Sequence, residues 1–417
     1  MRILQCGVAY SPNVGDGLIA ACMAHAVERL LPGAEFRSLD IAGREGFAEE
    51  DRRAGGPFGR ATLLRLLSAL PPSLRRFAVR RHLSAKLSAL EPGWRRALEE
   101  ADAVILGGGQ ILADADLNFP LKIGRLARLA AEAKGGAGLP LAIHAAGVTG
   151  GWSGEGRTLF ALLADTRLAA IGLRDAGSVE HWLDQADFGP PPMLTRDPGL
   201  LTAAAFPRPR GGDRRAGPVG LGIADPALLS YHAEGGVAGA GIDFQVALAA
   251  TLAAEGNDVL LFCNGAEEDA NALDCVAAHP RLARLVASGR VRAAPRPLVP
   301  AALAGIVAGC GGMVAHRLHA LIAAYSYGVP AVALGWDRKV ASFHEQVGRG
   351  AYTLTDGAAA VEDIAATLRR AVADPVPDIE RAAAADAALQ DMARTLAALG
   401  LPVETAPRAG VARGTAA

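Results

Sequence analysis

Three side chains that can carry positive charge stand close together at one point of the chain. His316, Arg317 and His319 follow the short apolar run Gly312–Ala315 and open a second apolar segment, Leu318–Tyr327, which has the length of a helix. A helix N-terminus disfavours cations, because its unpaired N–H groups already give it partial positive charge. Cations placed there are stabilised when an anion binds between them and the helix. The pattern therefore predicts an anion-binding site.

The geometry of this cluster sets one condition. At about 100° per residue, Arg317 and His319 point apart in a regular helix, so they converge only when Arg317 still belongs to the preceding turn. A metal ion is the rival ligand, since His316 and His319 are spaced to share one. No third ligand lies nearby in the sequence and no HExxH motif occurs, so we predict no metal. A serine hydrolase is also disfavoured, because the chain has no GxSxG motif.

Polar residues and glycines follow three other predicted strands. Asn13-Val14-Gly15-Asp16 comes after the first strand, where the glycine permits close approach of a ligand and Asp16 either caps a helix or acts on a substrate. The loop is neither a P-loop nor a GxGxxG motif. Gly107-Gly108-Gly109 either makes a tight turn or leaves room for a ligand. Arg174 either pairs with Asp175 or binds a phosphate or carboxylate.

These residues follow predicted strands and can meet only if the fold brings the strand ends together. The pattern of apolar residues predicts such a fold. Short runs typical of buried strands alternate with longer helical stretches such as 16–31, 121–134, 243–254 and 318–327. The predicted strands are Ile3–Val8, Ala103–Leu106, Leu141–His144, Ala169–Leu173, Val219–Ile223, Asp258–Cys263, Gly312–Ala315 and Ala331–Leu334. This alternation indicates an α/β protein with parallel sheets covered by helices on both faces. Ligands of such sheets bind beyond the carboxyl ends of the strands.

One shift in composition divides the chain. Residues 203–217 are rich in Pro, Gly and Arg without an apolar period, which is typical of a linker. We therefore expect two doubly wound domains, 1–202 and 218–400, with a cleft between them. The tail, 401–417, is expected to be disordered.

A basic helical insertion interrupts the first domain at about residues 55–100. Within it, Ser73–Leu90 places the apolar side chains Leu74, Phe77, Leu83, Leu87 and Leu90 near one helical face, with arginines and a lysine on the remainder. The segment is either a helix that lies on a membrane surface and meets a lipid-linked substrate, or an ordinary amphipathic helix packed on the domain.

Composition excludes several classes of protein. The 417 residues include 42 Lys and Arg and 43 Asp and Glu, so the net charge of -1 offers no cationic surplus for nucleic acid. With 51% hydrophobic residues the chain is not globally disordered. Its five cysteines are scattered, which fits a reducing compartment. Because the start lacks a signal peptide and no apolar run reaches about 18 residues, we expect a cytoplasmic protein.

Taken in order, the motifs resemble those of the polysaccharide pyruvyl transferase family. The resemblance spans about residues 1 to 350, and the Arg317-Leu318-His319-Ala320 block is its most diagnostic part. The matching segments are Asn13-Val14-Gly15-Asp16, Gly107-Gly108-Gly109, Arg174-Asp175, Asp197-Pro198, Arg317-Leu318-His319-Ala320, Gly328-Val329-Pro330 and Lys339.

The resemblance implies a GT-B-like pair of Rossmann-type domains. It also implies transfer of pyruvate from phosphoenolpyruvate onto two hydroxyls of a sugar, giving a cyclic ketal and phosphate, in exopolysaccharide or cell-surface glycan synthesis. No cofactor is implied, and the partners are phosphoenolpyruvate and a saccharide acceptor, free or lipid-linked. Peripheral contact at the inner membrane face is expected only if the basic helix within residues 73–90 lies on a membrane surface. Arg317 and Arg174 are expected to hold the phosphate and carboxylate.

The remaining roles follow the same resemblance. His319 is expected to be the general acid or a hydrogen-bond donor to phosphate, and Asp16 to orient or deprotonate the acceptor. Lys339 adds charge stabilisation. The other expected substrate contacts are Leu318, His316, Asn13, Gly15, Gly108 and Gly109.

Two rival functions fit the same pattern. One is a GT-B glycosyltransferase in which the helix that starts near Arg317 holds the diphosphate of a nucleotide sugar. The other is a non-catalytic, anion-binding member of the same fold.

Overall fold

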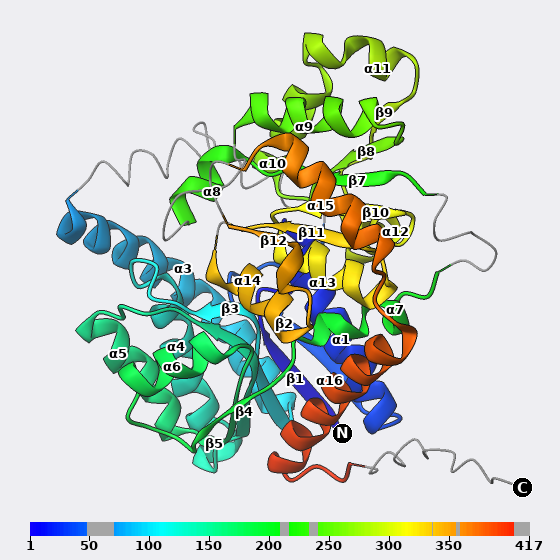
Figure 1. Ribbon diagram of the computed structural model, residues 1–417. Helices are drawn as coiled ribbons and strands as arrows, with labels where there is room; N and C mark the ends of the chain where they lie inside the picture. Colours follow the sequence, from blue (N-terminus) through cyan, green and yellow to red (C-terminus); the bar gives the residue numbers. More distant parts are fainter. Residues whose placement is uncertain (48–70, 209–216, 233–240, 336, 356–358, 404–417) are drawn as a thin grey trace, which may run out of the picture.

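Each half of the chain is built around one six-stranded parallel sheet (Figure 1). The structure, a computed structural model, describes residues 1–47, 71–208, 217–232, 241–335, 337–355 and 359–403. The first sheet has the order β2-β1-β3-β4-β5-β6. Its strands are β1 Arg2–Gly7, β2 Glu35–Asp40, β3 Ala103–Leu112, β4 Pro140–Val148, β5 Arg167–Leu173 and β6 Pro192–Leu194.

The second sheet has the order β12-β11-β10-β7-β8-β9, which read from the other edge is the order of a dinucleotide-binding fold. Its strands are β7 Val219–Gly222, β8 Val259–Phe262, β9 Val291–Ala293, β10 Gly312–Ala315, β11 Ala331–Leu334 and β12 Thr353–Leu354. The strand order reverses direction between β1 and β3 in one sheet and between β7 and β10 in the other. Such switch points open crevices at the carboxyl ends of the strands.

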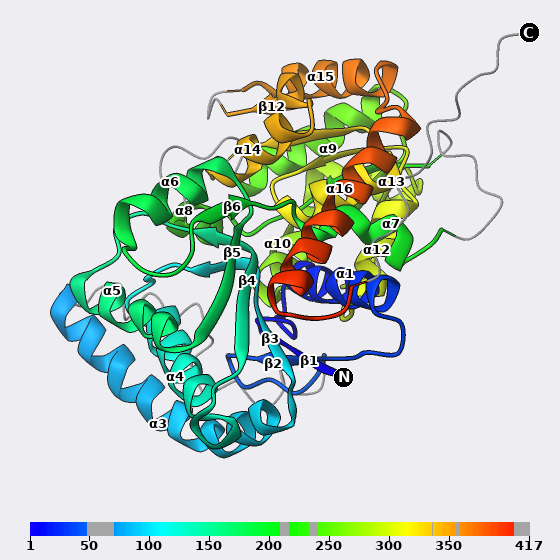
Figure 2. The ribbon, with the colours of Figure 1, turned by 90° about the horizontal axis from the view of Figure 1, so that it is seen from below.

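Helices cover both faces of each sheet (Figures 1 and 2). Those of the first half are α1 Val14–Leu30, α3 Pro72–Glu100, α4 Asn118–Glu132, α5 Gly154–Ala161, α6 Ala176–Gln185 and α7 Thr202–Ala205. Those of the second half are α8 Pro226–His232, α9 Ile242–Ala254, α10 Glu267–Ala277, α11 Ala283–Ala287, α12 Pro300–Ala308, α13 Leu318–Tyr327, α14 Arg338–Gln346, α15 Val361–Ala373 and α16 Asp378–Ala398. Short 3₁₀ turns are η1 Lys134–Gly136, η2 Leu162–Asp165, η3 Pro198–Leu201, η4 Pro280–Leu282 and η5 Gly350–Tyr352.

The two halves share a hydrophobic core. Every residue of α13 is buried, because this helix lies between its own sheet and α1 of the first domain. Ile19, Met23 and Val27 of α1 belong to the same apolar cluster as Leu321 of α13. A helix that is apolar on all sides must be buried between other elements, as α13 is. The shared core holds the carboxyl ends of the two sheets toward each other.

The structure confirms the predicted α/β class and the eight predicted strands, with small shifts at their ends. One interpretation was wrong: the triple glycine does not follow a strand but lies inside β3, which continues to Leu112. Gly108 and Gly109 have φ of 78° and 81°, a conformation that strands rarely contain. The register of β3 against β4 shifts just beyond them, between Gly109 and Leu112.

The C-terminal helix α16 returns to the first domain. It packs against β4, β5 and η3, although the sequence suggested that it belongs with the second domain. Asp391, which is fully buried, accepts a hydrogen bond of 2.7 Å from the backbone N–H of Arg196. His144 Nδ1 lies 2.8 Å from Thr395 Oγ1. The chain therefore crosses between the domains twice, near residues 198–217 and again at α16.

The described part of the predicted insertion is α3. Its second half packs on the first domain through Leu83, Leu87 and Trp94, as expected of an amphipathic helix. Leu74 and Phe77 are instead 54% and 66% exposed, so the prediction that they lie on one helical face with Leu83 and Leu87 was wrong. Residues 55–70 of the insertion, 209–216 of the linker and 404–417 of the tail lie outside the described residues.

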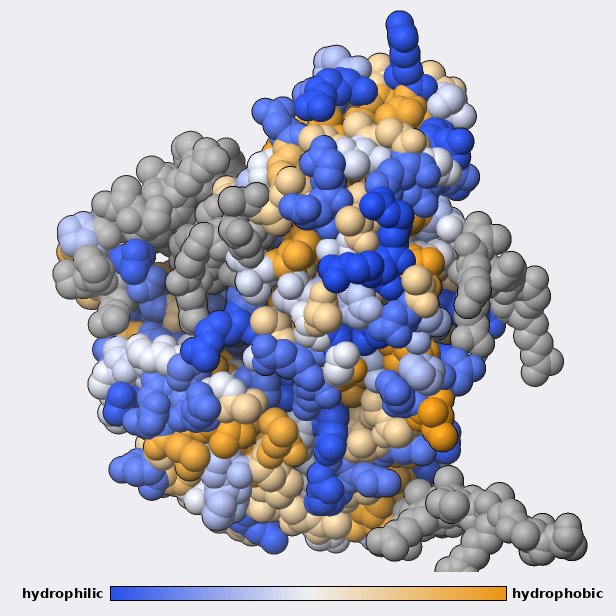
Figure 3. Space-filling view, viewed as in Figure 1, coloured by the Kyte–Doolittle hydropathy of each residue, from blue (hydrophilic) through white to orange (hydrophobic). Residues whose placement is uncertain are grey.

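Hydrophilic side chains are spread over the face shown in Figure 3, with apolar residues scattered among them on both domains. That distribution is ordinary for the surface of a globular protein. Among the described residues, no helix combines the length and the apolar character needed to cross a bilayer. All five cysteines are free thiols, and only Cys275 is exposed.

Candidate active site

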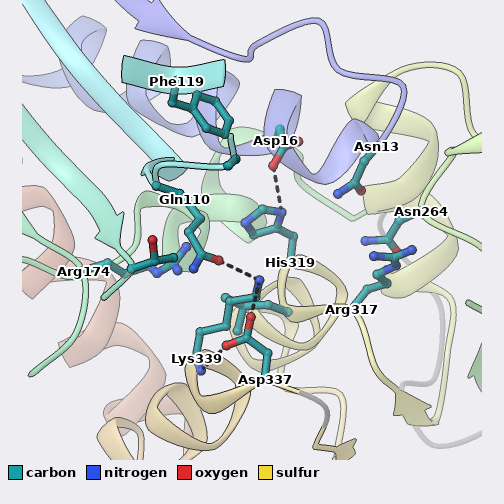
Figure 4. A pocket seen from close by; sticks show the side chains of 14 residues that line it. Asn13, Asp16, Gln110, Phe119, Arg174, Asn264, Arg317, His319, Asp337 and Lys339 are labelled. Carbon is teal, nitrogen blue, oxygen red and sulfur yellow. Dashed lines mark hydrogen bonds and ion pairs between the residues drawn. The ribbon is translucent and has the colours of Figure 1, made fainter. Parts of the chain in front are cut away.

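Arg317 lies in the turn between β10 and α13, as its predicted convergence with His319 requires. Arg317 is the N-cap of α13, with extended backbone angles of φ −78° and ψ 117°, and the helix begins at Leu318. Arg317 therefore precedes the helix, and its side chain and that of His319 face the same cavity (Figure 4). The helix ends at Gly328, which has φ of 69° as a C-terminal glycine requires.

The cavity lies between the two sheets, where their switch points face each other. Its volume is about 390 Å³, large enough for a small ligand of several polar groups. Side chains from the first domain line it together with side chains from the second. They are Asn13, Asp16, Gln110, Ala113, Ala115, Phe119, Thr149 and Arg174 from the first, and Asn264, Arg317, Leu318, His319, Asp337 and Lys339 from the second.

Arg317 is held by an acidic residue that the sequence did not reveal. Its Nε and Nη2 atoms donate hydrogen bonds of 2.9 and 2.5 Å to the two carboxylate oxygens of Asp269, a fully buried residue of α10. Asp269 also accepts a hydrogen bond of 2.9 Å from the backbone N–H of Asp225, after β7. This bidentate pair fixes the plane of the guanidinium group.

His319 and Asp16 meet across the domain boundary. His319 Nδ1 lies 3.6 Å from Asp16 Oδ1, and Nε2 is buried without a hydrogen-bond partner among the described residues. Burial, with smaller effects from Arg174, Lys339 and Arg317, lowers the pKa of His319 to about 3. The imidazole is therefore neutral at pH 7. A buried nitrogen with no hydrogen-bond partner is costly, and a ligand that bonds to it would remove this cost.

Asp16 is not the helix cap that the sequence left open. The N-cap of α1 is Asn13, and its side chain makes no capping bond. Burial raises the pKa of Asp16 to about 6, against the opposing effects of a hydrogen bond from Ser11 and the positive charges of Arg44 and Lys339. A carboxyl group with this pKa exchanges protons near neutral pH, as a catalytic acid or base must.

Gly15 explains how the two domains come so close. A Cβ atom at this position would stand 2.7 Å from His319 Nδ1 and 2.8 Å from its Cβ, so only glycine fits there. Gly109 lies beside the same pair, with its missing Cβ 3.7 Å from Asp16 Oδ1. Gly108 is different, because an added Cβ there would stand 2.9 Å from Cγ2 of Ile19 in α1.

Two more cationic groups stand at the other end of the cavity (Figure 4). The guanidinium of Arg174, whose side chain is 6% exposed, lies 3.6 Å from the carboxylate of Asp175 and 3.7 Å from that of Asp197. Lys339 Nζ lies 2.9 Å from Asp337 Oδ2 and donates a bond of 2.9 Å to Gln110 Oε1 of the first domain. Burial lowers the pKa of Lys339.

The Asn13 and Asn264 side chains stand opposite these cations, on the far side of His319 (Figure 4). The backbone N–H of Val14 donates a bond of 2.9 Å to the carbonyl oxygen of Asn264, so the loops after β1 and β8 touch. Asn264 is 2% exposed, and its Nδ2 has no partner among the described residues. This end of the cavity therefore offers neutral amide groups beside Arg317.

The structure brings together seven of the eleven predicted site residues along the cavity wall. Gly15 and Gly109 stand directly behind that wall, and Gly108 does not reach it. The structure does not bring His316 to the cavity wall, because His316 is buried just after β10, with 1% of its surface exposed. Sequence reasoning missed Gln110, Phe119, Asn264, Asp337 and Asp269 as site residues. Only Gln110, which directly follows the triple glycine, carried a local signal.

The charges of the cavity favour an anion, though by a small margin. Three cationic side chains, Arg174, Arg317 and Lys339, line it with two carboxylates, Asp16 and Asp337. The N-termini of α1 and α13 add partial positive charge. Within the described part of the chain, no group of three His, Cys, Asp or Glu side chains is placed to hold a metal ion. What converges here is therefore a set of groups for binding an anion and moving protons.

Comparison with known families decides the relationship. A family model described as polysaccharide pyruvyl transferase matches residues 13–338, which is well over half of the chain. The chain belongs to this family. The region that matches the polysaccharide pyruvyl transferase family begins at the cavity residue Asn13. It ends at residue 338, next to the cavity residue Lys339. No curated protein matches the chain in sequence.

Solved structures of the same architecture are distant in sequence. S. aureus MnaA, in a co-structure with UDP, has a TM-score of 0.51 and 11% identity, covering 95% of this chain and 93% of its own. E. coli ADP-heptose lipopolysaccharide heptosyltransferase II has a TM-score of 0.42 and 15% identity, covering 90% of this chain and 99% of its own. At such identities the likeness shows the fold alone. The likeness to MnaA, together with the two parallel six-stranded sheets, confirms the predicted GT-B-like pair of Rossmann-like domains.

Proposed function

We propose that this transferase family member moves pyruvate from phosphoenolpyruvate onto two hydroxyls of a saccharide. The acceptor would be an exopolysaccharide or cell-surface glycan, or its precursor. The observation that carries the proposal is the single cavity in which Arg317, His319 and Lys339 of the second domain face Asp16 and Arg174 of the first. Phosphoenolpyruvate is a compact anion with two charged ends. Cationic groups on both sides of His319 suit that shape.

The proposed reaction balances without a cofactor. A proton adds to the methylene carbon of phosphoenolpyruvate, which leaves an oxocarbenium-like centre at the neighbouring carbon. One sugar hydroxyl adds to that carbon, and a second hydroxyl displaces phosphate. Two C–O bonds form, one C–O bond to phosphate breaks, and the two hydroxyl protons end on the new methyl group and on phosphate.

The pKa values of the central pair suggest how protons move. Without a nearby anion, His319 is neutral at pH 7, since its pKa is about 3. A phosphate bound between the cations adds negative charge beside the ring and raises its pKa, so that His319 can hold the proton for the methylene carbon. Asp16, with a pKa of about 6, suits removal of the hydroxyl proton. Arg317 and Arg174 hold the phosphate and carboxylate, while Lys339 stabilises the charge that develops on the leaving phosphate.

Phosphate release tests the proposal directly. The purified chain is incubated with phosphoenolpyruvate and a panel of nitrophenyl hexopyranosides, and both inorganic phosphate and the ketal methyl signal in NMR spectra are followed. We expect phosphate and ketal in equal amounts. Nucleotide release from UDP- or ADP-sugars, with no reaction of phosphoenolpyruvate, would instead identify a glycosyltransferase. Thermal stabilisation by phosphoenolpyruvate without turnover would identify a non-catalytic anion-binding protein.

Substitutions in the cavity, compared with one outside it, distinguish loss of the site from a general loss of positive charge. Arg317→Ala and His319→Ala should each lower turnover at least about 100-fold while the protein stays folded. Arg338→Ala is the matched control, because Arg338 is exposed, neighbours Lys339 in sequence and does not line the cavity. Near-normal turnover in Arg317→Ala or His319→Ala would contradict the assignment.

A further inference from the structure

The first half of α3 presents an apolar face to solvent. Leu74 is 54% exposed and Phe77 is 66% exposed, in the first two turns of the helix. At about 100° per residue, Leu74, Arg81 and Ala85 lie on the side of α3 away from the buried Leu83, and Phe77 lies beside them. Arg81 and Ala85 are also exposed. The helix thus has two apolar faces, one packed on the domain and one that is exposed among the described residues.

The stretch of α3 that carries this outward face has charge of one sign, with Arg81 on the face itself. The segment Pro72–Leu90 contains four arginines and a lysine but no aspartate or glutamate. Arg80 is 59% exposed at its side chain although it pairs with Glu155, and Lys86 is exposed. An exposed Leu and Phe with cations around them match an interface in which apolar side chains enter a bilayer and cations contact its anionic headgroups. An anionic bilayer is negative over its whole surface, whereas a protein partner of ordinary composition carries charges of both signs.

The face also adjoins the cavity. Arg75 Nε forms an ion pair of 2.8 Å with Asp116 Oδ2, in the loop that follows β3. Ala115, the neighbour of Asp116, lines the cavity, as does Phe119 at the start of α4. The backbone at Ala115, Asp116 and Leu117 is left-handed, with φ of 43°, 56° and 69°. Asp114 Oδ1 accepts the N–H of Leu117 at 2.9 Å and so supports this strained loop. One ion pair therefore joins the start of α3, where the outward face lies, to the loop at the cavity rim.

We propose that the outward face of α3, centred on Leu74 and Phe77, docks on an anionic lipid bilayer and brings the cavity rim to membrane-bound acceptors. The docking surface is inferred from α3 itself; the lipid-linked acceptor rests on the function proposed above. The other face of α3 keeps its contacts with the first domain during docking, because Leu83, Leu87 and Trp94 point the opposite way. Docking therefore needs no rearrangement of the fold.

Vesicle flotation of the full chain tests docking without any substrate. Phosphatidylcholine vesicles, with or without phosphatidylglycerol, are mixed with the protein and floated through a density gradient. We expect binding to the vesicles that contain phosphatidylglycerol and little to pure phosphatidylcholine. Leu74→Glu combined with Phe77→Glu should lower the partition coefficient at least about tenfold. Arg81→Ala combined with Lys86→Ala should lower it by about fivefold for each charge.

Leu183→Glu is the matched control, because Leu183 is 63% exposed on α6 and has no link to α3. It should bind vesicles like the unchanged chain. Absence of binding to anionic vesicles would overturn the proposal, and so would an equal loss in Leu183→Glu. A fall in melting temperature for Leu74→Glu with Phe77→Glu, without vesicle binding by the unchanged chain, would show that the protein itself covers this face. Failure of phosphoenolpyruvate turnover would leave the flotation result unaffected, so the two proposals fail separately.

Discussion

Replacing Gly15 by alanine gives the sharpest test of the site's geometry. The new Cβ would stand 2.7 Å from His319 Nδ1, whereas ordinary contacts begin at 3.4 Å. The ring must therefore retreat by about 0.7 Å in a close-packed interface. Alanine favours the helix by up to about 1 kcal/mol, and overpacking costs about 1–3 kcal/mol, so the net loss of unfolding free energy is about 0–3 kcal/mol.

Activity should fall far more than stability. A shift of that size misplaces the imidazole relative to Asp16 and to any bound anion, and displacements near 1 Å cost about 100-fold in rate. Turnover is measured as phosphate release from phosphoenolpyruvate, and stability by urea unfolding. Gly305→Ala is the control, because Gly305 is in α12 and has nothing within 4 Å of an added Cβ. It should be slightly stabilised and fully active. A Gly15→Ala protein that is both more stable and fully active would refute the close approach of His319 to α1.

Three further changes test other parts of the site. Asp269→Asn removes the charge that orients Arg317 but keeps the shape, and should weaken phosphoenolpyruvate binding about tenfold in calorimetric titration; an unchanged affinity would contradict the positioning role. Asp16→Asn should raise the free energy of unfolding by up to about 3 kcal/mol above pH 6. This gain should vanish below pH 3.8, because the cost of the buried charge develops only as pH rises from the ordinary pKa of 3.8 to the raised pKa of about 6; unfolding at pH 4 and pH 8 checks the sign. Gln110→Ala breaks the hydrogen bond to Lys339 and should raise the KM for phosphoenolpyruvate about fivefold; an unchanged KM would show that the bond is unimportant.

Local patterns made much of the fold predictable. The β10–α13–β11 segment appeared with its observed bounds, because an apolar run, Gly328 and Pro330 together define strand, helix and turn. The strands β2, β6, β9 and β12 were missed. They are short or alternate with polar residues, and they lie in the outer parts of the sheets, where burial is incomplete. Their existence depends on pairing with distant strands rather than on their own composition.

The site was predictable where a motif placed several chemical groups together. Arg317, His319 and Asp16 stand out in the sequence by type and by position at strand ends. Asp269 and Asn264 do not, because an acidic residue in the first turn of a helix and an asparagine after a strand are common as caps and turns. Their importance comes from residues about 50 positions away, which only the fold brings near. The burial of His316 likewise follows from packing that its neighbours do not reveal.

The double crossing of the chain constrains how substrate can enter. The two segments at which the chain passes between the domains, η3 and α16, contact each other, so the two connections lie side by side. Asp197, which borders η3, touches Arg174, and the cations at that end therefore sit beside these connections. The amides of Asn13 and Asn264 lie across the cavity (Figure 4). A rotation of the two domains about these connections would move Arg174 little. It would break the backbone hydrogen bond between Val14 and Asn264, so this bond holds the domains together at the far end of the cavity.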